Sequence, residues 1–114
     1  MSIERDLSIA KDKYLRIMGE YVDLQHQSNT NVQKIESIEA LLKEAKESFC
    51  NVIDSACGHY IDGRLNKIRF KKMYADAFRS HVDNEEFSGK YNTTGSKYQS
   101  TIKCVKEWNP AHES

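Results

Sequence analysis

Two stretches of the chain repeat apolar residues at alternating intervals of three and four positions, each over three heptads. The first stretch contains Ile3, Leu7, Ala10, Tyr14, Ile17, Tyr21 and Leu24. The second contains Ile35, Ile38, Leu42, Ala45, Phe49, Val52 and Ala56. This spacing gives a helix one apolar seam and is typical of helices that pack side by side at a shallow angle. The pattern therefore predicts two long helices packed against each other.

The segment between the two stretches is polar, and it contains signals for a helix start. Thr30 and Gln33 have the spacing of a capping box, which would begin the second helix. Gly58 follows the last seam residue, where a left-handed residue commonly ends a helix. We therefore expect helices over residues 2–26 and 31–57, each about 37 Å long, in an antiparallel hairpin.

The first helix has more apolar surface than one seam requires. Leu15, Met18 and Val22 form a second line beside the seam and widen the apolar arc to about 160°. A helix with so wide an arc contacts two neighbours: the second helix, and either a later part of the chain or another copy of it. Because a two-fold dimer is the commonest way to close such a surface, we predict self-association as a homodimer through these three residues.

The apolar pattern changes after Gly58, and a third helix is expected over residues 60–83. Its apolar residues fall on two nearly opposite sides, so we expect a helix that bends near Ile68 or is contacted from both sides. One side holds Ile61, Leu65 and Ile68. The other holds Phe70, Met73, Tyr74, Ala77 and His81.

The rest of the chain predicts a loop and a short last helix. Residues 84–96 are rich in turn-forming residues, and Ser96 with Gln99 offers a second capping box. A helix over 97–108 would present Tyr98, Ile102, Val105 and Trp108 inward, and would end before Pro110. Residues 109–114 should fray. The predicted fold is an all-α helical bundle, a heptad hairpin plus a third helix and a short C-terminal helix, in a single domain over residues 1–114.

Composition narrows the functional classes. No apolar run is long enough to cross a membrane, and the N-terminal residues contain acids where a signal peptide needs an apolar block. Cys50, Cys57 and Cys104 are an odd number without the spacing of a metal site. We therefore expect reduced thiols in a cytoplasmic protein with no membrane partner.

Catalytic and metal-binding patterns are weak. His59 with Asp62, and Asp23 with His26, could each share a helix face, but no third ligand follows either pair. No pair of titratable groups has a placement that suggests acid–base catalysis. We expect no enzyme activity, no metal and no cofactor.

The segment "RLNKIRFKK", residues 64–72, has five basic side chains in nine positions. The whole chain has no net charge, but it has 7 basic and 10 acidic residues up to Cys57, then 10 basic and 7 acidic after it. On a helix, five cations fall within about 140° of one another. They are Arg64, Lys67, Lys71, Lys72 and Arg79.

These cations are the predicted partner-binding residues. Apolar residues alternate with them, which suits a protein interface with a charged rim. A phosphate backbone is the alternative partner, since aromatic residues stand nearby, but a pI of about 6.9 is low for a dedicated nucleic-acid binder. The cations could also only meet acids of the second helix across the bundle or a dimer: Glu36, Glu39, Glu44 and Glu47.

The predicted function is therefore a non-catalytic helical protein–protein interaction module, a self-associating small regulator or inhibitor. The alternative is a nucleic-acid-associated accessory protein that uses the basic face. A helical enzyme with an unrecognised site comes third.

Overall fold

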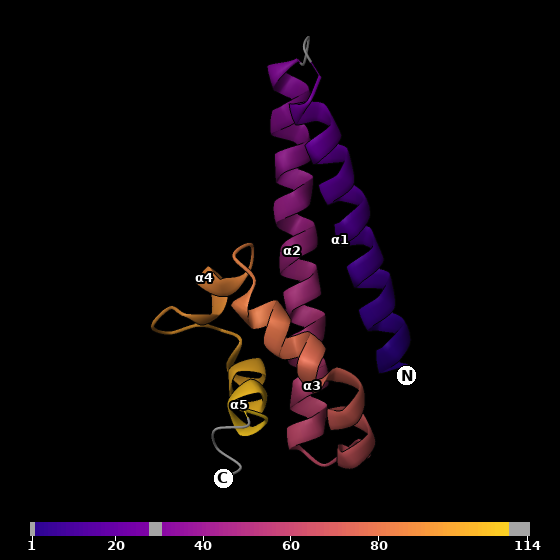
Figure 1. The fold of residues 1–114 in the computed structure, drawn as a ribbon, viewed down its shortest axis with the longest axis vertical. Coiled ribbons are helices and arrows are strands. Elements are labelled where there is room, and N and C mark those ends of the chain that lie inside the picture. The colour runs from indigo at the N-terminus through magenta and orange to yellow at the C-terminus, as the bar shows by residue number, and fades with distance from the viewer. Residues whose placement is uncertain (1, 28–30, 110–114) are drawn as a thin grey trace. The chain divides into compact units, whose positions relative to one another are not determined.

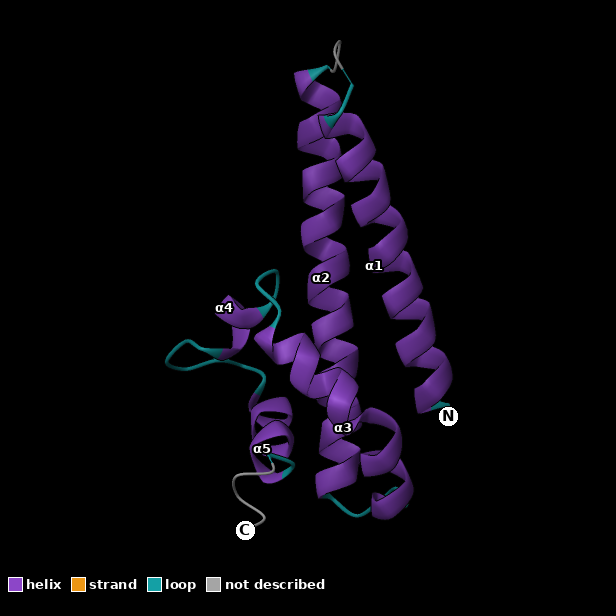
Figure 2. Cartoon of the chain, viewed as in Figure 1, coloured by secondary structure: helices purple, strands orange, loops and turns teal. Residues whose placement is uncertain are grey.

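The computed structural model describes residues 2–27 and 31–109, and within these ranges it is all-α with no strand (Figure 1). Five helices follow one another, separated by turns and loops (Figure 2). They are α1 (Ile3–Gln25), α2 (Val32–Ile61), α3 (Lys67–Asp83), α4 (Ser88–Tyr91) and α5 (Gln99–Glu107). No helix of the described part is long and apolar enough to cross a membrane. The predicted all-α class is confirmed.

The chain divides into two compact units, Met1–Val52 and Ile53–Ser114. The first unit is the predicted antiparallel hairpin, in which α1 lies alongside the N-terminal part of α2 (Figure 1). Ser2 begins α1, because its hydroxyl accepts a hydrogen bond from the Arg5 backbone N–H at 3.1 Å. The predicted capping box of α2 involves Thr30, which lies outside the described residues.

The predicted seams form the core of the hairpin. Every seam residue of both helices is buried or half-buried, and Leu7, Ile17 and Leu42 are among the buried ones. The Tyr14 ring stacks on Phe49 with 6.0 Å between the ring centroids. The heptad period therefore identified the contacting faces of α1 and α2 correctly.

The prediction that α2 ends at Gly58 is wrong. The backbone remains helical through this glycine, and the left-handed residue is Gly63, with a φ of 74°. The Gly63 N–H donates to the Tyr60 carbonyl at 3.1 Å, and the Arg64 N–H donates to the His59 carbonyl at 3.0 Å. This pair of bonds is a Schellman motif, which satisfies carbonyls that the helix end leaves open.

The predicted third helix over residues 60–83 is therefore wrong in its first turns. Asn66 begins α3, since its side-chain oxygen accepts a hydrogen bond from the Arg69 N–H at 3.0 Å. Ile61 belongs to α2 and Leu65 to the turn, so neither shares a helix face with Ile68.

The inner face of α3 also differs from the prediction. Phe70 and His81 are buried and Tyr74 is half-buried, as expected, but Met73 and Ala77 are exposed. The face is completed by two buried residues outside the predicted set, Ala75 and Phe78.

The predicted loop over residues 84–96 contains the short helix α4. The Phe87 and Ser88 N–H groups donate to the Asn84 carbonyl at 2.9 and 2.8 Å, which winds the chain into a helical turn. The turn buries the aromatic side chains of Phe87 and Tyr91. Burial of two aromatic residues four positions apart explains why this loop-like sequence becomes helical.

The predicted capping box before α5 is not formed. Ser96 donates its hydroxyl to the Lys90 carbonyl at 2.6 Å and accepts from the Tyr98 N–H at 3.2 Å. The side chain of Gln99 instead donates to the Ser96 carbonyl at 2.5 Å. Tyr98 is the N-cap residue of α5 and makes no side-chain capping bond. The predicted frayed tail, apart from Asn109, lies outside the described residues.

In the second unit, α5 packs on the C-terminal part of α2 through polar contacts as well as apolar ones. The backbone N–H and the hydroxyl of Thr101 both donate to one carboxylate oxygen of Asp54, each at 2.9 Å. The Cys104 thiol donates to the Cys57 carbonyl at 3.6 Å. In each of these two pairs the residues are 47 positions apart, so the contacts join two distant segments of the chain.

An aromatic cluster around Trp108 completes the core of this unit. The Trp108 ring N–H donates to the Tyr60 hydroxyl at 3.1 Å, and the two rings meet edge to face at 5.1 Å. Phe70 and Phe78 of α3 contact the same indole, with centroids 6.0 and 6.3 Å away. The indole therefore holds α2, α3 and α5 together.

Candidate interaction surfaces

The predicted basic residues do not lie on one helix face. Arg64 lies in the exposed turn between α2 and α3, whereas the other four cations lie on α3. The Lys67 ammonium lies 5.2 Å from the centroid of the Tyr60 ring. An exposed cation–π contact of this kind stabilises the fold by about 0.5–1 kcal/mol, so Lys67 already has a structural role at the start of α3.

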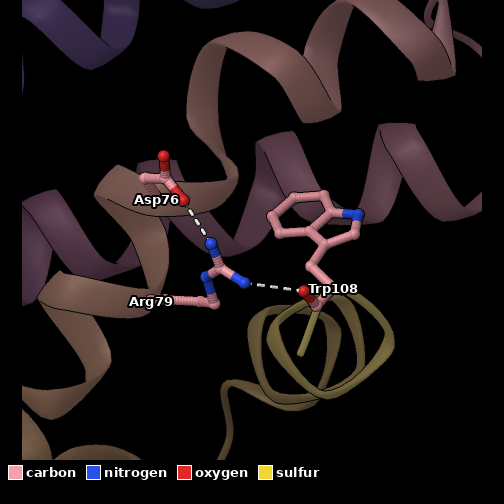
Figure 3. A network of polar contacts seen from close by, with 3 residues as sticks. All are labelled: Asp76, Arg79 and Trp108. Carbon is pink, nitrogen blue, oxygen red and sulfur yellow. Dashed lines mark hydrogen bonds and ion pairs between the residues drawn. The ribbon is translucent and has the colours of Figure 1, made fainter. Parts of the chain in front are cut away.

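Arg79 is held by contacts within the chain (Figure 3). One guanidinium nitrogen donates to the Trp108 carbonyl at 2.8 Å, and another forms an ion pair with Asp76. The Trp108 carbonyl lies at the C-terminus of α5, where helix carbonyls lack partners within the helix. Arg79 is therefore a side-chain cap that fastens α5 to α3, a role that the sequence did not reveal.

An open hollow of about 550 Å³ lies on α3 beside the end of α5, and we name it the Ile68 hollow. Its lining combines cations with apolar groups: Ile68, Lys71, Lys72, Ala75, Asp76, Arg79 and Trp108. Ile68 is 84% exposed, the highest value among the large exposed aliphatic residues of the described chain. Lys72 is exposed and Lys71 is half-buried.

A second open hollow of about 510 Å³, the Asp83 hollow, shares Asp76 and Arg79 with the first. Its other lining residues carry one further carboxylate and no further cation: Ser80, Asp83, Val105 and Asn109. The Asp76–Arg79 ion pair therefore belongs to both hollows, with lysines on one side of it and Asp83 on the other.

The predicted self-association residues lie on α1. Leu15 is 51% exposed and Val22 is 39% exposed, whereas Met18 is half-buried. On the same helix Ile9 is 57% exposed, but it points about 120° away from Leu15 at 100° per residue. The second apolar line of α1 is thus present and largely uncovered.

The buried titratable groups have the surroundings of structural groups. His81 and the Tyr91 hydroxyl form a hydrogen bond of 2.6 Å, and the Phe87 ring centroid lies 4.3 Å from that of His81. Burial lowers the pKa of His81 to about 4, so its imidazole is neutral at pH 7. A side-chain hydrogen bond to Cys104 and burial raise the pKa of the Cys57 thiol well above its usual range.

Cys50, Cys57 and Cys104 form no disulfide, and all three are fully buried. A buried thiol with a raised pKa is a poor nucleophile, because the thiolate is the reactive form. Within residues 2–27 and 31–109, the structure places no three histidine, cysteine or carboxylate side chains together as metal ligands.

Four residues of the Ile68 hollow were absent from the predicted site: Ile68, Ala75, Asp76 and Trp108. The available signal for Ile68 was its spacing, since a residue three and four positions before Lys71 and Lys72 lies beside them on a helix. Comparison with protein-family models, with curated proteins and with solved structures finds no significant match to this chain.

Proposed function

We propose that this chain is a non-catalytic protein–protein interaction module of the cytoplasm that self-associates and acts as a small regulator. The supporting observation is the second apolar line of α1, where Leu15 and Val22 remain largely exposed although the seam of the same helix is buried. Contiguous exposed apolar surface on a soluble domain usually marks an interface.

The free energy available from burying Leu15 and Val22 indicates a weak, concentration-dependent dimer. Full burial of an aliphatic side chain stabilises by about 1.5–3 kcal/mol, so a half-exposed leucine or valine still has about 1 kcal/mol to gain. Across a two-fold contact, Leu15 and Val22 of both copies would give about 4 kcal/mol. Association costs about 4–15 kcal/mol, so Met18 and its neighbours must also contribute for the dimer to form.

Analytical ultracentrifugation tests this proposal. The monomer mass is 13.2 kDa, and we expect the average mass to rise toward twice that value between about 10 and 500 µM, the range of weak dimers. Leu15→Glu should keep the chain monomeric, because it would bury a charge in the contact.

Ile9→Glu is the matched control. It changes an equally exposed aliphatic residue of α1 to the same acid on another side of the helix, so association should persist. A wild-type chain that stays monomeric throughout the range, or equal losses in the two variants, would contradict the proposed contact.

A further inference from the structure

We propose that the Ile68 hollow binds a segment of a partner protein in which an apolar side chain is flanked by carboxylates. The hollow lies on α3, apart from the apolar line of α1 in the sequence and in a different compact unit. This proposal therefore stands whether or not the chain dimerises through Leu15 and Val22.

The apolar part of the recognition comes from Ile68. A β-branched residue gives a helix slightly less stability than alanine or leucine would, and Ile68 gains almost nothing from burial within this chain because it is nearly fully exposed. Ala75 and Trp108 also line the hollow, but both residues are buried within the chain. An aliphatic side chain of a partner could cover Ile68 and remove it from water.

The positive charge of the hollow favours a partner segment with negative charge. Lys71, Lys72 and Arg79 contribute three positive charges, and Asp76 pairs with Arg79. The lining therefore has three positive charges and one negative charge beside the exposed Ile68. Carboxylates that flank an apolar side chain complement this arrangement, and such complementarity fixes register and accelerates association.

A protein segment fits the hollow better than a nucleic acid does. Asp76 lies within the hollow and Asp83 lines the adjoining one, so a phosphate backbone that continued along α3 would meet two carboxylates. A phosphate backbone also offers no aliphatic group to Ile68. The lining contains only three cations, and affinity for nucleic acid at physiological salt depends on many phosphate contacts.

Trp108 provides a local readout, because it is the only tryptophan of the chain and its backbone carbonyl is held by Arg79 at the hollow. The probe is a short, end-blocked peptide of repeated Glu-Leu-Glu triplets, titrated while tryptophan fluorescence is followed. We expect saturable binding of this peptide and none of the matched peptide with lysine in place of glutamate. Replacing leucine by alanine in the peptide should weaken binding about tenfold or more.

Charge reversal locates the site. Lys71→Glu combined with Lys72→Glu should weaken binding of the Glu-Leu-Glu peptide at least about tenfold, and Ile68→Ala should weaken it several-fold. The matched control is Lys103→Glu combined with Lys106→Glu, which makes the same charge change at two exposed lysines of α5 outside the hollow. This control should bind like the wild type.

Carbodiimide cross-linking followed by mass spectrometry gives a second readout that does not depend on fluorescence. It should join peptide carboxylates to Lys71 or Lys72 in preference to Lys103 and Lys106. Cross-links spread evenly over these lysines would overturn the proposal.

Three binding results would also overturn the proposal. The first is equal affinity for the leucine and alanine peptides, or no binding of any peptide. The second is an equal loss of binding in the control pair. The third is tighter binding of a random-sequence DNA duplex than of the peptide, with a steep salt dependence that the Lys71 and Lys72 variant abolishes, because the surface would then recognise phosphate.

Discussion

Acid should destabilise the second compact unit through His81 before the carboxylates protonate. Burial lowers the pKa of this imidazole from 6.5 to about 4, and its Nε2 atom is hydrogen-bonded to the Tyr91 hydroxyl. In the unfolded chain the same imidazole regains its ordinary pKa. Protons therefore bind the unfolded state more tightly, and the stabilisation that is complete above pH 6.5 is lost as the pH falls toward 4.

The size of the loss follows from the two pKa values. At pH 5 the unfolded imidazole is almost fully protonated and the folded one only about one-tenth protonated, which lowers the free energy of unfolding by about 2 kcal/mol relative to pH 7. Below pH 4 the loss would approach about 3 kcal/mol, since one pKa unit corresponds to 1.36 kcal/mol.

Urea denaturation followed by the fluorescence of Trp108 measures this loss, because Trp108 and His81 belong to the same unit. For a chain of this size, a loss of about 2 kcal/mol should lower the urea midpoint by about 1 M between pH 7 and pH 5. His81→Gln keeps a hydrogen-bonding side chain but does not titrate, so its midpoint should change much less.

The control His26→Gln removes an exposed histidine of the first unit and should retain the full loss. A wild-type midpoint that is the same at both pH values would refute the reasoning. An equal loss in His81→Gln would also refute it, since the protons would then bind elsewhere.

Two further predictions concern glycines and thiols. Gly63→Ala should lower the free energy of unfolding by about 1–2 kcal/mol because φ is positive there, whereas Gly58→Ala should raise it by up to about 1 kcal/mol, since the added Cβ meets Ser100 at an ordinary 3.6 Å; urea denaturation checks both, and the opposite order would contradict the assigned end of α2. An aromatic disulfide reagent should react with Cys50, Cys57 and Cys104 only after denaturant is added, because all three are fully buried; rapid reaction of the native protein would contradict that burial.

The hairpin could be predicted from the sequence because the apolar spacing that specifies it lies within each helix. In α1 and α2 the seam residues recur every three or four positions, so a single helix carries the whole signal. The side of α1 that holds Leu15 and Val22 was identified for the same reason. What covers that side depends on other molecules or distant segments, and periodicity contains no information about either.

The local sequence left two choices for the end of α2, because two glycines five residues apart are both acceptable stops. The choice depends on packing with a segment about 47 residues away. Cys57 accepts a hydrogen bond from Cys104, and Tyr60 accepts one from Trp108. These contacts require helical backbone on both sides of Gly58, and their benefit outweighs the roughly 1 kcal/mol by which glycine weakens a helix.

The candidate site depended on the same boundary. A helix taken to begin at residue 60 placed Ile68 on one side with Ile61 and Leu65. Gly63 followed by Asn66 was the available signal, since glycine favours helix ends and asparagine favours helix starts. The role of Arg79 had no local signal at all, because its acceptor is a backbone carbonyl 29 residues later in the chain.

The contacts that hold α3 and the end of α5 together affect how tightly the Ile68 hollow could bind a partner segment. Its two walls are α3 and the end of α5, and they are joined by the Arg79–Trp108 hydrogen bond and by the packing of Trp108 against Phe70 and Phe78. A partner segment would therefore meet Ile68 and Lys72 on backbone that is already ordered, and would lose little binding free energy to ordering of the site. Arg79→Lys separates this contribution from charge, because it keeps the cation but cannot bridge a carboxylate and a carbonyl in the same fork geometry. If a firmly held α5 matters for binding, this variant should weaken the peptide although the charge of the hollow is unchanged.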